Sequence, residues 1–339
     1  MFRREIQTNI DAVTTLDVVC FGELIWDLYE ADAKAAEKDS ISRTFRRELG
    51  GASVNVAITL ARLAAKAGVA GAVGADKLGN AFEAALGNEG VETGGIVRGA
   101  GSTSVAFVTL GASGEASFIP HRGADLRLTE DEVTTSMAKA RYVLVSTSAM
   151  LPAAKPATLK FLAAADKAKA VVVTDLNVRA HLWSSVGADA DAMREATNEL
   201  VERSALVKAS ERDLNAIAGK RGMSWLDEHA KHASWILTRG ENGAAAVGEH
   251  GQVTAPTKRV RCIDRSGAGD AFTAGVLAVL VKAGAKPGTA EWKDPKTWTR
   301  ALEVGHLLGA KAVASLGATT SLTSLDDVKS RLAAQKKAG

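Results

Sequence analysis

The feature that most constrains the fold is an alternation of short, β-branched apolar runs with longer stretches rich in Ala and Leu. The run Tyr142–Thr147 is followed by Lys155–Lys169, and Val171–Asp175 is followed by Ala188–Arg203. Strands and helices that alternate in this way form a mostly parallel sheet, with helices on both of its faces. The sequence therefore predicts an α/β fold of the doubly wound type.

Two segments, residues 26–49 and 100–123, interrupt the alternation. The second holds two apolar runs on either side of a Gly-Ala-Ser-Gly turn, a pattern typical of a β-hairpin with a four-residue loop. We expect both segments to form a small β lid, which would keep water away from a site beneath it. The remaining boundaries predict an N-terminal extension at 1–16, one domain at 17–327 and a C-terminal tail at 328–339.

Charge and cysteine content narrow the class of protein. The 42 Lys and Arg residues nearly balance the 39 Asp and Glu residues and are scattered along the chain, which does not favour nucleic-acid binding. The apolar stretch Ala271–Val281 is far shorter than the ~20 residues that span a bilayer. Two cysteines, Cys20 and Cys262, give no disulfide framework and favour a reducing compartment. We expect a cytoplasmic protein that binds neither nucleic acid nor membrane.

The strongest local signal is Asp264–Phe272, a turn of small residues that leads directly into an apolar helix. Gly267, Ala268 and Gly269 leave backbone N–H groups accessible to an anion, and the following helix adds the positive end of its dipole. These features predict a phosphate-binding turn. Asp270 would then be placed to accept a proton from an attacking hydroxyl. An Asp here could also be a simple helix cap, and the nonapeptide alone favours neither interpretation.

A second turn of small residues opens a helix at Gly50–Ala57. Its paired glycines permit close approach of a ligand to the backbone, and Asn55 offers both a donor and an acceptor to a polyol. Taken alone, this segment favours the simpler interpretation, a glycine-rich cap with a solvated Asn. The chain contains no GxxxxGK[ST] loop, no GxGxxG motif that opens a βα unit and no GxSxG elbow, so the common glycine-loop chemistries fit less well.

Together, the two segments resemble the signatures of the ribokinase-like carbohydrate kinases, also called the PfkB family. Gly50–Gly90 resembles the N-terminal signature and Asp264–Phe272 the more specific C-terminal one, and the resemblance extends from about Asp17 to about Ala318. It implies an ATP-dependent kinase that phosphorylates a sugar hydroxyl and uses ATP and Mg²⁺, with a requirement for K⁺ left open. It also implies a homodimer formed through the lid, since an exposed β edge is readily covered by the same edge of a second copy of the chain.

The resemblance assigns roles to individual residues. The catalytic set is the base Asp270 with an anion hole made by the amides of Gly267, Ala268 and Gly269. The residues expected to bind the sugar are Asp27, Gly51, Asn55, Arg122, Asp175, Asn177 and Arg179. Those expected to bind the nucleotide are Lys208, Ser210, Thr238, Gly240 and Gly243, together with Gly267 and Gly269. Glu211 is the implied, indirect contact to the metal ion.

The sequence departs from the family pattern at two places. Arg265 stands where Thr is common, as a neutral replacement or an additional phosphate contact. The usual Asn-x-x-Glu motif corresponds to Ser210–Asp213, with both ends changed.

The sugar is predicted from two further segments. Asp175–Trp183 resembles the fructokinases and the 2-keto-3-deoxygluconate kinases, and Phe118–Asp125 resembles a shortened fructokinase lid segment. We expect fructose to be preferred over 2-keto-3-deoxygluconate, with ribose third and a nucleoside as a further alternative within the family. A sugar- or nucleotide-binding regulator without turnover is the alternative from another class. The retained Asp270 argues against it, because a pure binder needs no base.

Overall fold

The computed structural model describes residues 15–30, 44–110, 116–229, 232–314 and 317–319. Most of the predicted N-terminal extension and all of the predicted tail lie outside the described residues. Within the described part, no helix combines the length and the apolar character that crossing a membrane requires.

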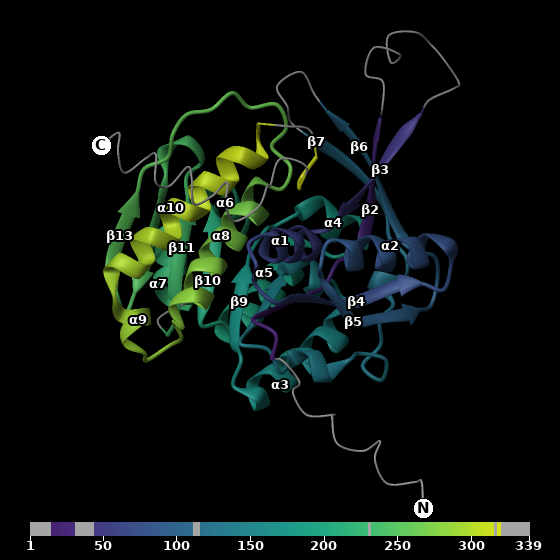
Figure 1. The fold of residues 1–339 in the computed structure, drawn as a ribbon, viewed down its shortest axis with the longest axis horizontal. Helices are drawn as coiled ribbons and strands as arrows, with labels where there is room; N and C mark the ends of the chain where they lie inside the picture. The colour runs from purple at the N-terminus through teal and green to yellow at the C-terminus, as the bar shows by residue number, and fades with distance from the viewer. Residues whose placement is uncertain (1–14, 31–43, 111–115, 230–231, 315–316, 320–339) are drawn as a thin grey trace, which may run out of the picture.

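Nine strands form one large sheet in the order β13-β12-β11-β10-β9-β8-β1-β4-β5 (Figure 1). Their bounds are β1 (Val18–Phe21), β4 (Ala67–Gly74), β5 (Glu92–Gly99), β8 (Tyr142–Ser146), β9 (Val171–Asp175), β10 (Leu206–Ser210), β11 (Ser234–Thr238), β12 (Ala244–Gly248) and β13 (Gly251–Ala255). Neighbours from β5 to β11 are parallel, and β12 and β13 are antiparallel additions at one edge. The predicted, mostly parallel sheet is therefore confirmed.

Helices cover both faces of this sheet, as predicted. One face carries α1 (Ala52–Arg62), α2 (Lys77–Asn88), α8 (Ala268–Ala283) and α10 (Pro295–Ala312), with the short α9 (Ala290–Lys293). The other carries α3 (Lys155–Ala168), α4 (Ala180–Ser185), α5 (Ala190–Glu202), α6 (Glu211–Ala218) and α7 (Met223–His229). Side chains of a strand alternate between its two faces, so Val18 and Cys20 of β1 enter one core and Val19 and Phe21 the other.

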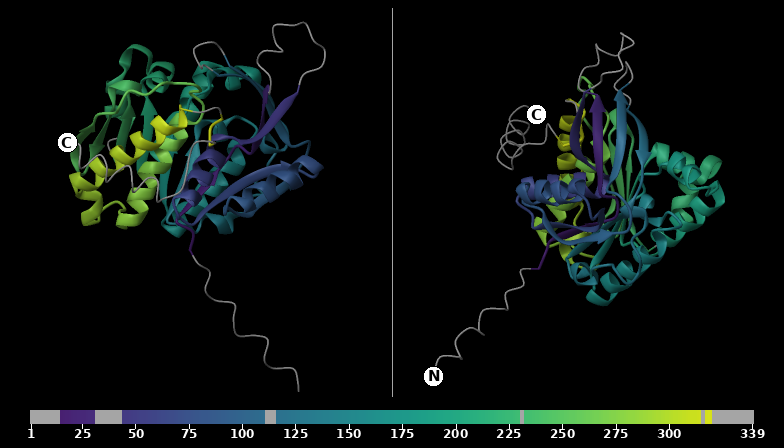
Figure 2. Two further views of the ribbon diagram at one scale, coloured as in Figure 1. Left: turned by 45° about the horizontal axis from the view of Figure 1, so that its top comes forward. Right: turned by 90° about the vertical axis from the view of Figure 1, so that its right-hand side faces the viewer.

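A separate four-stranded sheet forms the lid. Its order is β3-β2-β6-β7, with β2 (Ile25–Glu30), β3 (Phe45–Gly50), β6 (Ser104–Leu110) and β7 (Ala116–His121). The predicted hairpin is confirmed, because β6 and β7 pair antiparallel. Its turn lies outside the described residues, as do residues 31–43 of the other lid segment. Figure 2 shows the four strands projecting from the body of the molecule, and Trp26 of β2 packs edge-on against Phe82 of α2.

The lid is fixed to the body at the start of β6. Asp76, the N-cap of α2, accepts hydrogen bonds from the backbone N and the Oγ1 of Thr103, each at 2.7 Å. The Thr103 hydroxyl also accepts a 3.0 Å bond from the N–H of Gly74, at the end of β4. The lid strands therefore leave the large sheet from a rigid point at the carboxyl ends of its strands.

Candidate active site

The predicted site residues collect at the carboxyl edge of the large sheet, beneath the lid. Parallel strands end at the same edge, and open α/β sheets bind ligands there. The strand β9 ends in Asp175 and the neighbouring β10 in Ser210. Helix α8 begins at Ala268 and brings Gly269 and Asp270 to the same place in its first turn.

Asp270 is buried and joins the two glycine-rich turns of the sequence. Asn55, in the first turn of α1, donates its Nδ2 to the Oδ2 of Asp270 at 2.8 Å. Burial raises the pKa of Asp270 to about 6, and nearby Asp175 adds to the rise. The Asn55 hydrogen bond and two cations, Arg179 and Lys208, oppose it. A carboxylate with this pKa is ionised at neutral pH and can still accept a proton.

A buried ion pair lies behind Asp270. Lys208 donates its Nζ to the Oδ1 of Asp175 at 3.0 Å, and the Thr273 hydroxyl donates to the Oδ2 at 2.8 Å. Both oxygens of Asp175, which we expected to contact the sugar, thus bind protein donors. Burial lowers the pKa of Lys208, but the carboxylates of Asp175, Asp213 and Asp270 together outweigh burial, so the net shift of that pKa is upward. A Cβ added to Gly269 would come 3.0 Å from this Nζ, so the ammonium lies beside the predicted anion hole.

The turn before α8 has the shape of an anion site. Gly267 is the N-cap and has a left-handed φ of 70°, which favours glycine. A Cβ there would come within 2.5 Å of the Cβ of Ala318. Asp264 is fully buried and accepts from the N–H groups of Ser266 at 2.8 Å and Gly317 at 2.9 Å. Because the first N–H groups of a helix lack partners within it, the ordered turn presents donors and a positive dipole end.

The lid contributes Asp27, a buried residue of β2 that faces the body. Burial, and next the neighbouring Glu23, raises the pKa of Asp27 to about 8, with a further contribution from Asp270. A Cβ at Gly50 would come within 2.4 Å of the Asp27 carboxyl group. At Gly51, which has a φ of 97°, it would come within 2.3 Å of the carbonyl oxygen of Glu23. The two glycines therefore allow the start of α1 to lie directly against the lid.

The loop after β9 is held by Asp213, for which the sequence predicts no role. Asp213 accepts from the N–H of Val178 at 2.8 Å, and from the N–H and hydroxyl of Ser210 at 2.8 and 2.7 Å. It thereby fixes the loop in which Asn177 takes a positive φ of 38° and Arg179, the N-cap of α4, is exposed. The capping-box spacing of Ser210 and Asp213 was the available signal.

The residues predicted to bind the nucleotide lie along the ends of β10 and β11. Ser210 caps α6, and the side chain of Glu211, the first residue of that helix, is exposed. Thr238 ends β11, and Gly240 and Gly243 shape the following turn with φ values of 53° and 87°. The described residues contain no group of three or more His, Cys, Asp or Glu side chains suited to a metal ion. A single carboxylate fits Mg²⁺ held mainly by phosphate oxygens and water.

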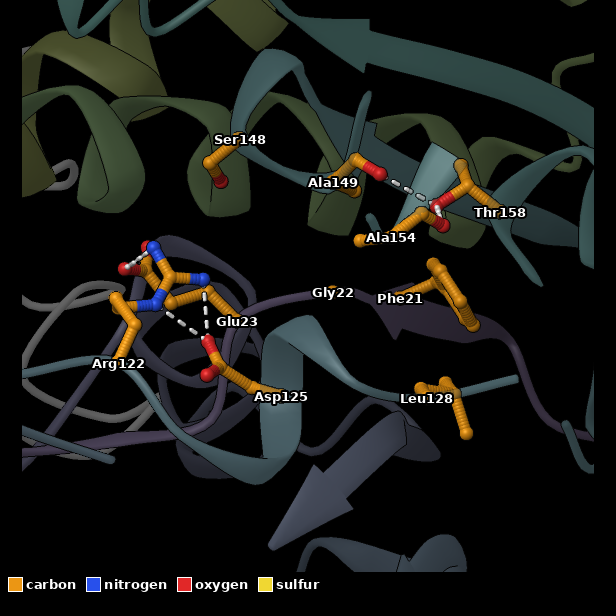
Figure 3. A pocket seen from close by; sticks show the side chains of 10 residues that line it. All are labelled: Phe21, Gly22, Glu23, Arg122, Asp125, Leu128, Ser148, Ala149, Ala154 and Thr158. Carbon is orange, nitrogen blue, oxygen red and sulfur yellow. Dashed lines mark hydrogen bonds and ion pairs between the residues drawn. The ribbon is translucent and has the colours of Figure 1, made fainter. Parts of the chain in front are cut away.

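Arg122, which we expected to contact the sugar, is enclosed by protein carboxylates (Figure 3). Its Nη1 lies 3.0 Å from the Oε1 of Glu23, and its Nε donates to the Oδ2 of Asp125 at 2.7 Å. The adjoining cavity, lined also by Gly22 and Ser148, has a volume of about 10 Å³. That space holds at most one water molecule. That cavity is therefore too small to hold a sugar.

A doubly wound sheet with a lid over a glycine turn and a buried carboxylate defines the class of small-molecule kinases. The sequence model of the pfkB family carbohydrate kinases matches residues 15–325. This chain therefore belongs to that family, and it is a sugar kinase.

Curated relatives and solved structures agree with this assignment. The chain is 30% identical to fructokinase-1 of Oryza sativa subsp. japonica, over 90% of this chain and 94% of the relative. It is 29% identical to fructokinase-1 of Zea mays, with the same coverage. The structure of a fructokinase with bound ATP from Xylella fastidiosa matches with a TM-score of 0.80 and 27% identity, over 94% of this chain and 99% of that one. An aminoimidazole riboside kinase from Salmonella enterica shares the fold (TM-score 0.77, 23% identity, covering 93% and 100%).

Proposed function

We propose that the protein transfers the γ-phosphoryl group of ATP to a hydroxyl of a neutral ketose, with fructose as the first candidate. The observation that carries this proposal is the 2.8 Å hydrogen bond between Asn55 and Asp270. It unites a sugar-binding amide, a buried base and the N-terminus of α8 beneath Asp27 of the lid. Relatives named fructokinase support the choice of sugar.

The sugar is proposed to lie between the lid and the start of α1. Asn55 keeps its Oδ1 buried and without a hydrogen-bond partner in the described part of the chain, so this oxygen is available to a sugar hydroxyl. Asp27 supplies a second acceptor from the lid, and the close approach allowed by Gly51 leaves the backbone near the ligand. Asn177 and Arg179 complete the rim. Such polar groups orient a polyol, and most of the rate enhancement comes from that positioning.

Asp270 is proposed to be the base. The sugar hydroxyl loses its proton to Asp270 as its oxygen forms a bond to the γ-phosphorus, and the bond from phosphorus to the bridging oxygen of the departing ADP breaks. The N–H groups of Gly267, Ala268 and Gly269 donate to the phosphoryl oxygens, and the Lys208 ammonium adds positive charge beside them. Donors that are fixed before the reaction stabilise the developing charge without reorganisation.

ATP is proposed to lie along the carboxyl ends of β10 and β11. Ser210, Thr238 and the two-glycine turn at Gly240 and Gly243 would hold its nucleoside and inner phosphates. A Mg²⁺ ion on the phosphates would neutralise their charge, with Glu211 contacting it through water. The Xylella fastidiosa fructokinase was solved with bound ATP, which supports this nucleotide. We propose that the kinase domain extends over residues 17–327.

The surroundings of Arg122 favour a neutral sugar over the keto-acid alternative. A substrate carboxylate would have to displace Glu23 or Asp125 from the guanidinium, and the ion pair with Asp125 is buried while that with Glu23 is partly buried. We propose that Arg122 acts through Glu23, by holding it beside Asp27. The exposed Arg179 is the cation that remains accessible to an acidic substrate, and it keeps 2-keto-3-deoxygluconate as the second candidate.

A homodimer through the lid is also proposed. Alternation along the strands places Asp27 on the inner face and Leu28, Phe107 and Ile119 in one row on the outer face. Ile119 is 56% exposed and Phe45, nearby on β3, is 39% exposed. A second copy would cover this row of apolar side chains and remove them from water.

The test is ADP release by the purified protein with fructose, 2-keto-3-deoxygluconate, ribose, adenosine and inosine. We expect the highest kcat/KM with fructose. Preference for the keto-acid sugar would overturn the choice of substrate and leave the kinase assignment intact. Tight sugar or nucleotide binding without ADP release from any acceptor would instead support the regulator.

A further inference from the structure

The buried ion pair of Asp175 and Lys208 bridges two strands and reaches helix α8. The two residues are direct neighbours in the register of β9 and β10, and their side chains are 4% and 7% exposed. Lys208 holds one oxygen of the carboxylate at 3.0 Å, and the hydroxyl of Thr273 in α8 holds the other at 2.8 Å. Asp175 is therefore occupied by protein donors and too deeply buried to face a sugar.

Thr273 is an exception in the composition of its helix. Apart from Asp270 and Lys282, the other residues of α8 are Ala, Gly, Val, Leu and Phe. A hydroxyl inside a helix commonly bonds the carbonyl oxygen of the preceding turn, which here would be that of Gly269, but the Thr273 hydroxyl donates to Asp175 instead. Because residues three and four apart share one face of a helix, α8 turns the face with Gly269 and Asp270 toward the ion pair.

The Lys208 ammonium has unused donors at this place. An ammonium carries three N–H donors, and within the described part of the chain the Nζ of Lys208 makes one hydrogen bond, to Asp175. Burial lowers the pKa of Lys208, but the surrounding carboxylates raise it more, so the group is charged at neutral pH. A Cβ on Gly269 would lie 3.0 Å from the Nζ. Since buried donors nearly always find partners, the remaining donors beside the anion-hole turn indicate a ligand oxygen.

The groups next to Lys208 favour a phosphoryl oxygen over a sugar hydroxyl. The N–H groups at the start of α8 and the positive end of its dipole suit an anion, and a lysine ammonium binds phosphate as a point charge. The buried acceptor that suits a sugar hydroxyl, the Oδ1 of Asn55, belongs to α1. The donors for the phosphoryl group therefore come from α8 and β10, and the acceptors for the sugar come from α1 and the lid.

Building on the proposed function, we propose that Asp175 and Thr273 are positioning residues, which hold the Lys208 ammonium at the start of α8 so that its remaining donors bind the γ-phosphoryl group of ATP. The register of β9 and β10 fixes the ion pair, and α8 carries both the anion hole and the threonine that anchors the pair. The ammonium is thereby in place before the nucleotide binds. Asp175 orients a lysine and makes no contact with the sugar.

The experiment uses Thr273→Val, Thr273→Ser, Asp175→Asn, Lys208→Met and the double variant Asp175→Asn/Lys208→Met. Thr174→Val is the matched control for Thr273→Val: this threonine of β9 is also buried, but its hydroxyl pairs with that of Ser204. Alternation along the strand places it on the face away from Asp175. Calorimetry measures the affinity for ADP and for the non-hydrolysable β,γ-imido analogue of ATP, and ADP release gives kcat and the KM for the best sugar of the panel.

We expect Lys208→Met to lower affinity for the imido analogue about 10- to 100-fold, the size of a hydrogen bond to a charged group, while affinity for ADP and the sugar KM stay within about twofold. Thr273→Val should lower analogue affinity and kcat about 3- to 10-fold, because one of the two anchors of Asp175 is lost. Thr273→Ser should recover most of that loss. Asp175→Asn should lower analogue affinity by itself and add little to Lys208→Met, because it acts through the same ammonium.

Equal loss of affinity for ADP and for the imido analogue in Lys208→Met would overturn the contact to the γ-phosphoryl group. A sugar KM that rises on Asp175→Asn, with and without Lys208, would make Asp175 a sugar contact. If Thr273→Val behaved like Thr174→Val, the anchoring role would be wrong. Thr273→Val and the double variant leave no unpaired buried charge, so they decide the matter even where a single charge removal prevents folding.

The binding measurements need neither sugar nor turnover, so they separate this inference from the proposed function. A wild-type protein that phosphorylates no acceptor, while Lys208→Met and Thr273→Val lose affinity for the imido analogue alone, would sink the proposed function and keep the inference. Rapid phosphorylation of fructose by a wild-type protein, with analogue affinity unchanged in Thr273→Val and in the double variant, would do the reverse.

Discussion

The large sheet and the lid sheet are built from similar strands but are covered differently. Every residue of β1, β4, β8 and β9 is buried, because helices pack on both faces of the large sheet. In the lid, the inner face of β2 buries Asp27 and Tyr29, whereas the outer face leaves Phe45 and Ile119 exposed. One sheet is a closed core and the other has a single packed face.

The difference in covering suggests different roles for the body and for the lid. The proposed base and anion hole lie at the start of α8, which packs against α1 and α10 over the closed core, so we expect their geometry to be fixed before any ligand arrives. Asp27 and Tyr29 stand on a sheet whose other face is uncovered. We infer that the body determines the chemistry and that the lid determines which sugar reaches it and when.

The largest effect is expected in the body. Asp270→Asn keeps the shape of the side chain but cannot accept the proton, so we expect kcat to fall about 10²- to 10⁴-fold, the usual contribution of a general base. ATP affinity should remain within a few-fold. ADP release and calorimetry measure the two quantities. A kcat near that of the wild type would return Asp270 to the role of a helix cap and place the chemistry elsewhere.

A substitution on the lid should lower turnover less than Asp270→Asn does. The same substitution should raise the thermal stability of the protein. Asp27→Asn should lower kcat/KM for the sugar about 3- to 10-fold, because the amide keeps the shape of the side chain but makes a weaker hydrogen bond to the sugar. The pKa of Asp27 is about 8 when folded, above its ordinary value of 3.8. The folded protein therefore loses stability as pH rises from about 4 to about 8, because ionisation is disfavoured in the folded state.

Asn cannot ionise, so Asp27→Asn should gain thermal stability relative to the wild type as pH rises through this window, with the difference levelling off above pH 8. Melting temperatures from pH 5 to 9 would show it. Asp131→Asn, at an exposed residue, is the control and should show no such trend. If the melting temperatures of the wild type and Asp27→Asn changed with pH in the same way, ionisation of Asp27 would not destabilise the folded protein, and burial would not raise its pKa.

The order of the main elements and the turn before α8 could be predicted from the sequence, because their signals are local. A run such as Val171–Asp175 is β-branched, and small residues leading into an apolar helix mark Asp264–Phe272. The strand β4 gave no such signal. Its sequence, Ala67–Gly74, consists of Ala, Gly and Val, and Ala and Gly are depleted in strands. Its place is set by packing, since a Cβ at Gly71 would come within 2.5 Å of the carbonyl oxygen of Gly22.

Roles that depend on contacts between distant segments could not be predicted. Asp213 holds the N–H of Val178, 35 residues away, and Thr273 holds Asp175, 98 residues away. No local pattern records either pairing. For the same reason Arg122 was expected to contact the sugar: its enclosure depends on Glu23, which lies far earlier in the chain, just before β2.

The pH dependence of turnover tests the body without any substitution. Asp270 must be ionised to act as the base, and its pKa is about 6. We expect kcat/KM to fall toward tenfold per pH unit below pH 6. A further change near pH 8 would report the ionisation of Asp27, whose pKa is about 8. The profile is measured by ADP release at saturating ATP. If kcat/KM fell only near pH 4, the pKa of the base would not be raised by burial. Asp270 would then be more accessible to water than the structure indicates.

The smallest effect on chemistry is expected from the outer face of the lid. Ile119→Lys places a charge on the row of apolar side chains proposed as the dimer contact, so we expect a monomeric mass by light scattering at micromolar concentration. Val247→Lys, at an equally apolar and 45% exposed position in β12 of the large sheet, is the control and should leave the mass unchanged. Because Ile119 lies on the face away from Asp27, kcat should change less than about threefold. If the second subunit holds the lid in place, loss of the dimer should raise the KM for the sugar. A monomeric mass for the wild-type protein would contradict the proposed dimer and would mean that no second copy covers the outer face of the lid. A large fall in kcat on Ile119→Lys would break the division itself, since chemistry on α8 should not depend on a residue of the outer lid.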